Sequence, residues 1–435
     1  MSGKCIGFLC LVLAVGIAGV YAQTLNTGTF LGTVSDPSGA AVPEATVRVV
    51  REGTSFERAT ATGPDGTYQL LEIPAGRYRI AVEKTGFQRG EQAGLELSAG
   101  QTLRVDLLLA VGAVTETVQV EARIAQVDTA TANVGSTIFG SHVQELALNT
   151  RSFTQLIRLQ PGVNSLQAQQ PGFGSNTGVP FSFNGGQTSS NNWLLDGGRN
   201  IDTYNGNNLT MVNLDAIAEV RIERNAYSAE FGRNAGAQIN VISRSGSNQV
   251  HGTLFEFFRN DKLDSRNFFA TSKPKNRYNN FGGTVGGPIK RDKLFFFLSN
   301  EYRRIIQTTG TRTSIVPTPE QIAGDFSGGR VISHPDTQQP FPNNRIPASL
   351  LDPNAQILVK NYYAQPTPGF RQGALNFSSS APDGTKYRSA LGRLDYNVSP
   401  TLTIFGRYNI DSTRLDSPFG LFAGNPMPGV AASEQ

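Results

Sequence analysis

Cysteine is almost absent from this chain of 435 residues: Cys5 and Cys10 are the only two, and both lie at the very start. The rest of the chain can form neither a disulfide nor a thiolate metal site. Charged residues make up only 17% of the sequence, and the net charge is +4. This composition excludes a disordered polyelectrolyte, and so mild a positive charge without interleaved aromatic side chains argues against nucleic-acid binding.

Enzymatic motifs are missing as well. The sequence has no G-x-S-x-G, Walker A, G-x-G-x-x-G or H-E-x-x-H motif. Its three histidines, His142, His251 and His334, are far apart. We therefore expect no catalytic residue, no cofactor and no enzymatic activity.

Long apolar runs are limited to one, which extends from Ile6 to Val20 and follows Lys4. A positive residue, an apolar run of this length and a small residue at Ala22 are typical of a secretory signal peptide, so residues 1–22 are predicted to be cleaved off. No later run reaches the ~18–20 residues of a membrane helix. The mature chain can therefore cross a membrane only as a β-barrel.

Glycine and proline, by contrast, are abundant, with 47 and 23 residues. Between residues 25 and 110, turn sequences such as Asp65-Gly66 separate short β-prone segments every 8–12 residues. Six or seven short strands with this spacing predict a β-sandwich. The clearest expected strands are residues 30–35, 45–51, 67–71, 77–83 and 103–109.

This region resembles a carboxypeptidase regulatory-like domain, a transthyretin-like sandwich grouped with carbohydrate-binding-like folds. The matching stretches are Gly32-x-Val34-x-Asp36, Asp65-Gly66-x-Tyr68 and Pro74-x-Gly76-x-Tyr78. The region has no histidine or cysteine, so it cannot form a peptidase zinc site. The resemblance implies a periplasmic binding or spacer module, and a purely structural spacer is also open.

Residues 111–122 form an extended, β-prone linker. It resembles the TonB box of outer-membrane receptors, which an energy-coupling protein captures by strand addition; main-chain hydrogen bonds then supply the affinity. The linker could equally be the last strand of the sandwich. The resemblance implies that five residues couple to a TonB-type protein: Glu116, Thr117, Val118, Gln119 and Val120.

Two short helices are expected next. The spacings Ser141-x-x-Gln144 and Ser152-x-x-Gln155 each fit a capping box. Phe153, Leu156 and Ile157 then share one helix face. Further on, residues 217–224 alternate apolar with mostly charged side chains, which predicts a half-exposed strand.

This middle region, residues 123–247, resembles the plug domain of TonB-dependent receptors in the Oar-like group. The resemblance rests on Asn149-x-Arg151-x-Phe153, Leu195-Asp196-Gly197 and the run from Ile217 to Ser247. It implies contacts between plug and barrel through Arg221, Glu223, Arg224 and Arg233.

A polar loop within this region is a candidate ligand contact, as are residues 164–183 and 198–211 as a whole. The spacing of the Asp and Asn residues in the polar loop does not fit an EF-hand, so we predict no metal site. A solvated loop is the alternative. The candidate ligand residues are Asn200, Asp202, Tyr204, Asn205 and Asn207.

From residue 248 onwards the pattern is that of hairpins. Along residues 401–411, Leu402, Ile404 and Tyr408 fall on one face, and Arg407 and Asp411 fall on the other. Such apolar–polar dyads, joined alternately by short turns and long loops, predict the first strands of an antiparallel transmembrane β-barrel. A soluble sandwich also has alternating strands, but its connections are more even.

The sequence therefore predicts a mainly β protein: a sandwich (25–110), a linker (111–122), an α+β plug (123–247) and the start of a barrel (248–435). By resemblance, it acts in TonB-dependent ligand reception and transport in the outer membrane, with the sandwich in the periplasm. The ligand would be a siderophore, an oligosaccharide or a peptide. The alternative is a secreted or surface-attached β protein that binds carbohydrate.

Length gives a further expectation. Five strands are recognisable after Ser247, whereas single-chain bacterial barrels have even strand numbers, and those that enclose a plug need about 22. We expect the chain to be the N-terminal part of a longer receptor.

Overall fold

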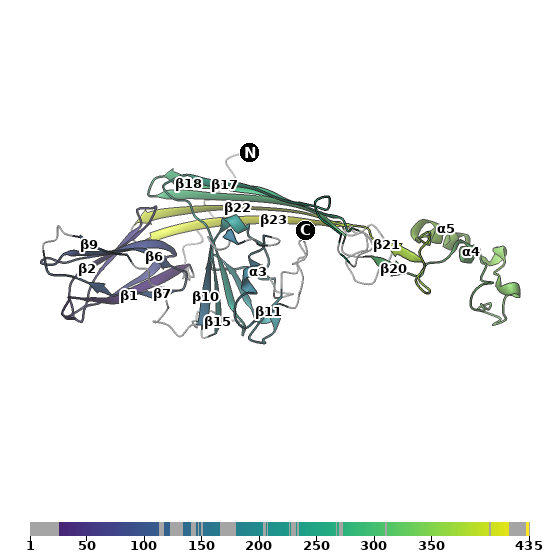
Figure 1. The fold of residues 1–435 in the computed structure, drawn as a ribbon, viewed down its shortest axis with the longest axis horizontal. Helices are drawn as coiled ribbons and strands as arrows, with labels where there is room; N and C mark the ends of the chain where they lie inside the picture. The colour runs from purple at the N-terminus through teal and green to yellow at the C-terminus, as the bar shows by residue number, and fades with distance from the viewer. Residues whose placement is uncertain are drawn as a thin grey trace, which may run out of the picture.

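The structure, a computed structural model, describes most of the chain after the predicted signal peptide. Figure 1 shows three parts: a sandwich (residues 27–121), a central domain (134–243) and a long sheet (251–434). The second part lies beside the first, and both lie under the third. The described residues are 26–112, 117–121, 134–140, 145–146, 148, 151–165, 180–202, 206, 208–225, 227, 232, 235–266, 268, 273–308, 311–399, 402–416 and 432–434.

The predicted sandwich is confirmed, and it consists of two packed sheets. Its core joins them through contacts such as Phe30 against Tyr78, whose rings meet edge to face at 5.6 Å. One sheet has the order β4-β1-β7 with β8 also on β1, and the other has the order β3-β2-β5-β6-β9. The strands are β1 (Thr27–Ser35), β2 (Thr46–Arg51), β3 (Glu57–Ala61), β4 (Thr67–Pro74), β5 (Gly76–Glu83), β6 (Arg89–Leu97), β7 (Thr102–Arg104), β8 (Leu107–Leu108) and β9 (Thr117–Glu121).

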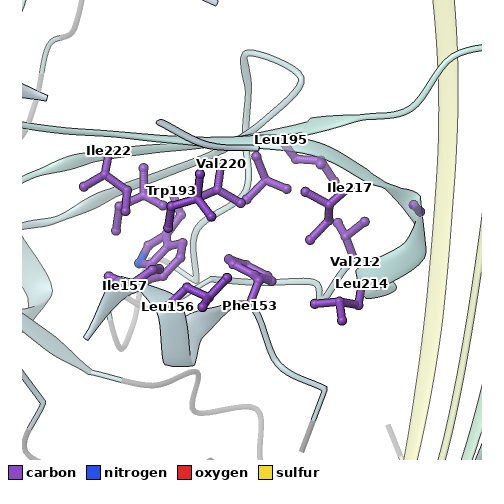
Figure 2. Packing of buried hydrophobic residues seen from close by; sticks show 14 of the residues in the cluster. Phe153, Leu156, Ile157, Trp193, Leu195, Val212, Leu214, Ile217, Val220 and Ile222 are labelled. Carbon is purple, nitrogen blue, oxygen red and sulfur yellow. The ribbon is translucent and has the colours of Figure 1, made fainter. Parts of the chain in front are cut away.

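The central domain is built on a five-stranded sheet with the order β10-β15-β16-β13-β14. Figure 2 shows its core, in which Trp193 and Val220 of the sheet face Leu156 of α3 and Phe153, the residue just before that helix. Trp193 is the one tryptophan of the sequence and is 2% exposed. The elements are β10 (Val134–Phe139), α3 (Thr154–Ile157), β11 (Val163–Ser165), β12 (Phe181–Phe183), η1 (Thr188–Ser190), β13 (Asn192–Leu195), β14 (Gly198–Arg199), η2 (Leu214–Ala216), β15 (Ile217–Asn225) and β16 (Gln238–Ser243).

The second predicted capping box is wrong. The N-cap of α3 is Phe153, which makes no side-chain cap. The Ser152 hydroxyl lies one residue too early and instead shares a hydrogen bond of 2.7 Å with the Thr154 hydroxyl, because a short polar side chain readily bonds locally. The first predicted box, at 141–144, lies outside the described residues.

The prediction of a half-exposed strand at 217–224 is also wrong. In β15 the apolar face lies in the core of the central domain, but Glu219, Arg221 and Glu223 on the other face are buried as well. The sandwich covers that face, as its contacts below show. The two-residue alternation therefore predicted correctly which face of the strand is charged, but it predicted incorrectly that this face is exposed to solvent.

The long sheet has the order β17-β18-β19-β22-β23-β24, and all its pairs are antiparallel. Short turns join β18 to β19 and β22 to β23, whereas residues 261–275 and 308–382 form the long connections. The predicted dyads are confirmed: Leu402, Ile404 and Tyr408 are exposed on the outward face, and Arg407 reaches the central domain from the inward face. The neighbouring strands follow the same pattern, with Ser299, Glu301 and Arg303 buried on the inward face and Leu298 and Leu394 exposed on the outward face. The strands are β17 (His251–Asn260), β18 (Asn276–Lys290), β19 (Leu294–Gln307), β22 (Asp383–Ser399), β23 (Leu402–Asp416) and β24 (Ala432–Glu434).

The long connection between β19 and β22 forms a small structure of its own, which projects from the end of the sheet farthest from the sandwich (Figure 1). Its helix α4 begins with a complete capping box between Thr318 and Gln321. No helix in the described parts of the chain is both long and apolar enough to cross a membrane. The elements of this connection are β20 (Arg312–Ser314), α4 (Pro319–Ile322), η3 (Pro342–Asn344), η4 (Ala348–Leu350), α5 (Pro353–Tyr362) and β21 (Phe377–Ser379).

Candidate functional site

A buried carboxylate of the central domain organises its contact with the long sheet. Asp196 follows β13 in a tight turn, with φ of +50°, and is followed by Gly197 at +76°. This backbone geometry turns its side chain away from the core and toward the long sheet. The carboxylate accepts hydrogen bonds from the Ser243 amide (2.8 Å) and the Ser243 hydroxyl (2.7 Å), which fix it in place.

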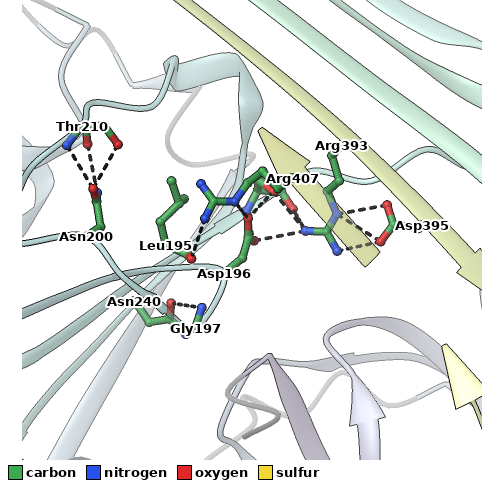
Figure 3. Close-up of polar contacts among 10 residues, drawn as sticks. Leu195, Asp196, Gly197, Asn200, Thr210, Asn240, Arg393, Asp395 and Arg407 are labelled. Carbon is green, nitrogen blue, oxygen red and sulfur yellow. Dashed lines mark hydrogen bonds and ion pairs between the residues drawn. The ribbon is translucent and has the colours of Figure 1, made fainter. Parts of the chain in front are cut away.

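Two arginines of the long sheet reach this carboxylate (Figure 3). Nη1 of Arg393, on β22, lies 3.1 Å from Oδ1 of Asp196, and Nε of Arg407, on β23, lies 2.9 Å from Oδ2. Arg393 also pairs with Asp395 at 2.8 Å, and its guanidinium lies 4.7 Å from the centre of the Phe405 ring. Two carboxylates and two guanidinium groups give the cluster no net charge, which a largely buried site requires. We call these four charged residues the Asp196 network.

A second contact lies at the opposite edge of the long sheet, on the edge strand β17. Arg151 of the central domain forms a buried ion pair with Asp215 and stacks on two rings of β17. Its guanidinium lies 4.6 Å from the centre of Phe255 and 4.0 Å from the centre of Phe257. Burial raises the pKa of Asp215, and the neighbouring Arg151 opposes that rise. An arginine suits this position because its flat guanidinium can stack and bond a carboxylate at once.

Direct hydrogen bonds complete the attachment. The Asn213 amide donates to the Ser299 hydroxyl of β19 at 2.9 Å, and the Tyr387 hydroxyl of β22 donates to the Met211 carbonyl at 3.3 Å. Through these contacts the central domain touches β17, β19, β22 and β23.

The residues predicted to join plug and barrel make other contacts. Arg221 and Glu223 pair with each other at 2.8 Å, beside Gly100 of the sandwich, and Arg224 donates to the Pro161 carbonyl at 2.6 Å. Their contact with the long sheet stays a prediction, and Arg233 lies outside the described residues.

Between the sandwich and the central domain, the key contact is Glu219. Its carboxylate accepts a hydrogen bond of 2.8 Å from the Ala99 amide in the turn before β7. Burial raises the pKa of this carboxyl, while the Ala99 amide, Ser98 and Arg221 lower it, and Glu96 adds to the rise. A cavity of about 570 Å³ separates the sandwich, the central domain and the long sheet, and Glu219, Ser243 and Asp395 are among its lining residues.

Of the predicted ligand residues, the structure describes two. The Asn200 side chain is buried and closes its own loop: it accepts from the Thr210 amide and hydroxyl and donates to the Thr210 carbonyl, each at 3.0 Å (Figure 3). Asp202 is partly exposed, and its carbonyl accepts from the Gly206 amide at 2.8 Å. Tyr204, Asn205 and Asn207 lie outside the described residues. Within the described part of the chain, no cluster of side chains could hold a metal ion.

The segment predicted to couple to TonB is a strand of the sandwich. Thr117, Val118, Gln119 and Val120 belong to β9, which pairs in parallel with β6 from Arg89 to Ala93. β9 is the last strand of its sheet. Glu116 lies outside the described residues. The backbone therefore agrees with the alternative that this segment is the last strand of the sandwich.

The sequence alone does not reveal the Asp196 network as a unit. It places Arg407 on the polar face of a strand and Asp196 in a turn motif, but Asp196 lies about 200 positions before Arg393 and Arg407. The network could have been suspected from the charged residues on one face of two neighbouring strands, because a charge that is buried needs a counter-charge.

Comparisons with known proteins agree with this three-part architecture. Three family models match: carboxypeptidase regulatory-like domain at residues 29–110, TonB-dependent receptor plug domain at 133–237, and outer membrane beta barrel domain at 242–435. The TonB-dependent transporter Oar of Myxococcus xanthus is 28% identical over 303 residues, which are 66% of this chain and 28% of that protein.

Solved structures give weaker similarity. The outer membrane transporter YddB of Escherichia coli matches with a TM-score of 0.41 and 13% identity, over 66% of this chain and 34% of that one. The siderophore receptor PirA of Acinetobacter baumannii matches with a TM-score of 0.36 and 18% identity, over 65% and 31%. The chain thus spans about a third or less of the length of these relatives.

The matched models follow one another in the order that the resemblance implied, and the outward face of the long sheet is apolar. The models name a plug and an outer-membrane barrel, and proteins with this pair of domains are transport proteins rather than enzymes. The chain therefore carries the plug and outer-membrane barrel domains of TonB-dependent receptors, preceded by a carboxypeptidase regulatory-like domain, and it is similar to the Oar-like group of these receptors.

Proposed function

We propose that this chain serves ligand reception and active transport across the Gram-negative outer membrane, energised through a TonB-type protein. The observation that carries the proposal is the Asp196 network. It holds a folded central domain on the inward face of a sheet whose outward face is apolar. Because non-covalent contacts hold the described part of the domain on the sheet, a mechanical pull can shift the domain without breaking the chain.

The position of β9 supports coupling to TonB. An end strand of a sheet has one row of unpaired backbone groups, and a partner strand can add to that row. Only twelve residues separate the end of β9 from the start of β10, which pairs with β15 in the central domain. A pull on β9 would therefore be passed to the sheet of the central domain through this short connection.

The ligand would contact the polar loop between β14 and η2 and the connections at the far end of the long sheet. Asn200 has a supporting role in this proposal, since its side chain is used up in closing the loop. Asp202 and the residues after it would face the ligand. The proposed ligand classes are siderophore, oligosaccharide and peptide.

The test is binding of a purified TonB C-terminal domain to the full chain. In a strand, neighbouring amides point to opposite edges, so one of Val118 and Gln119 directs its N–H to β6 and the other to the open edge. We expect at least one of the variants Val118→Pro and Gln119→Pro to lose TonB binding, because proline removes a backbone N–H that would bond the added strand. Gln119→Ala is the matched control and should bind normally, since strand addition reads the main chain. Normal binding by both proline variants would contradict the proposal.

The alternative of a secreted carbohydrate-binding protein is not retained. It requires a chain that leaves the membrane, whereas this one carries outer-membrane barrel strands.

A further inference from the structure

The outward face of the long sheet changes character along its length. Toward the short turns it is apolar, with Val285, Leu298, Leu394, Ile404 and Ile410 exposed. In a membrane barrel such a band faces the hydrocarbon of the lipid. Residues beyond the band therefore lie at the level of the lipid headgroups.

Basic side chains replace the apolar ones at the other end of the same face. On β19 the alternation that exposes Leu298 and Tyr302 also turns Arg304 outward, and Arg304 is exposed. Arg304 pairs in register with Lys386 of β22, and Lys386 pairs with Arg414 of β23. One step nearer the band, Arg388 pairs with Tyr302. We call Arg304, Lys386, Arg388 and Arg414 the outer basic patch.

This arrangement is unfavourable for the protein alone. Like charges directly opposite each other on neighbouring strands repel, and here three of them stand in one row. Arg414 forms an ion pair with Asp416 at 3.3 Å, which offsets part of this repulsion. The Arg388 guanidinium lies 5.5 Å from the centre of the Tyr302 ring. In the described part of the chain, Arg304 and Lys386 have no ion pair. Glu256 also faces outward, but β18 separates its strand from β19.

The depth of the patch in the membrane follows from its neighbours. Phe281 and Tyr302, with ring centres 5.1 Å apart, lie in the same row as Arg388, between the apolar band and the row of Arg304, Lys386 and Arg414. Aromatic side chains at the edge of an apolar band mark the interface between hydrocarbon and headgroups. Long basic side chains just beyond such a belt can extend to the headgroups.

The patch lies at the outer surface of the membrane. Long connections of bacterial barrels are on the outer side and short turns on the periplasmic side. The patch is at the end that leads into the connections 261–275 and 308–382. At the opposite end, Asn248 beside the short turn bonds both Asp292 and Gly53 of the sandwich.

We propose that the outer basic patch binds the phosphate groups of a phosphorylated lipid headgroup in the outer leaflet. Charge complementarity carries the proposal: three strands present four cations at headgroup depth, and within the described residues Arg304 and Lys386 have neither an ion pair nor a ring contact. Phosphate oxygens bridging Arg304 and Lys386 would remove their repulsion, and arginine can bind phosphate through two N–H groups at once. This inference depends on the outer-membrane assignment and not on coupling to TonB.

The test uses the full chain in nonionic detergent and vesicles of phosphatidylcholine doped with bisphosphorylated lipid A. We expect the double variant Arg304→Gln/Lys386→Gln to bind these vesicles about tenfold or more weakly than the unchanged chain. The matched control, Lys290→Gln/Lys293→Gln, removes the same charge at the short-turn end and should bind within about twofold. Normal Trp193 emission will show that both double variants are folded.

A third set of vesicles tests whether the patch recognises the phosphate groups of the lipid. Vesicles doped with dephosphorylated lipid A should bind the unchanged chain as weakly as the phosphorylated vesicles bind the patch variant. Equal affinity for the two lipids would overturn the proposal. An equal loss in both double variants would overturn it too, because the effect would then be general charge and not this patch.

Discussion

Oδ1 of Asp196 in the central domain lies 3.1 Å from Nη1 of Arg393 in the long sheet, in a site where both side chains are nearly buried. The two residues are 197 positions apart in sequence. Removing one partner of a buried pair costs more than the pair contributes, because the other charge stays behind in a medium that solvates it poorly. This relationship makes the Asp196 network the most sensitive point of the attachment.

Asp196→Asn should therefore destabilise the chain by about 3–5 kcal/mol, because it leaves two guanidinium groups around a neutral amide. Trp193 is the one tryptophan and lies in the core of the central domain, so its fluorescence during urea unfolding reports this loss directly. Glu57→Gln breaks the partly exposed ion pair with Arg48 and serves as the control, with an expected change of about 0–1 kcal/mol. Equal midpoints for the two variants would show that the network contributes no stability.

Arg151→Lys tests the stack on β17. Lysine keeps the charge beside Asp215 but loses the flat contact with Phe255 and Phe257, so we expect a loss of about 1–2 kcal/mol. Arg158→Lys, at an exposed position after α3, should change the free energy of unfolding by less than about 0.5 kcal/mol. If both substitutions have the same small effect, the stacking contributes nothing.

Glu219→Gln tests the buried carboxyl between the sandwich and the central domain. Its pKa is raised in the folded chain, so the folded chain retains a proton that the unfolded chain releases above its ordinary pKa of 4.5. The free energy of unfolding must then fall as pH rises from that value through the raised pKa. Glutamine can still accept the Ala99 hydrogen bond without a charge.

We therefore expect Glu219→Gln to match the unchanged chain below pH 4.5 and to be more stable above it, with a flatter dependence on pH. Urea unfolding at a series of pH values, followed through Trp193, measures both slopes. Glu57→Gln, at a partly exposed site, should leave the slope unchanged. Parallel slopes for all three chains would show that Glu219 is not the responsible group.

Gly66→Ala tests the turn before β4. Gly66 has φ of +74°, and a Cβ there would lie 2.6 Å from the Val34 carbonyl oxygen. Gly39 has φ of +86° but open space around it. Alanine at Gly39 should cost about 1–2 kcal/mol for the backbone alone, and alanine at Gly66 should cost more because of the added clash. Hydrogen exchange of the β1 and β4 amides compares the two; equal exchange rates would argue against the clash.

The sequence determined the order and type of the three parts. Turn residues such as Asp65-Gly66 and two-residue alternation such as Leu402 to Ile410 are local signals, and local signals survive without knowledge of the fold. The same alternation identified which side chains of β23 point inward. It also placed the charged face of β15, although it could not show that the sandwich covers it.

Tertiary structure alone decided which charges meet. Asp196, Arg393 and Arg407 come from three strand ends or faces that adjoin only once the central domain lies on the long sheet. The contacts of Arg221 and Glu223 lie toward the sandwich for the same reason, since β15 has its second face covered by another domain. Pairing over such distances depends on how whole sheets pack, and no spacing in the chain encodes it; the sequence supplies the charges, and the packing of the three parts selects their partners.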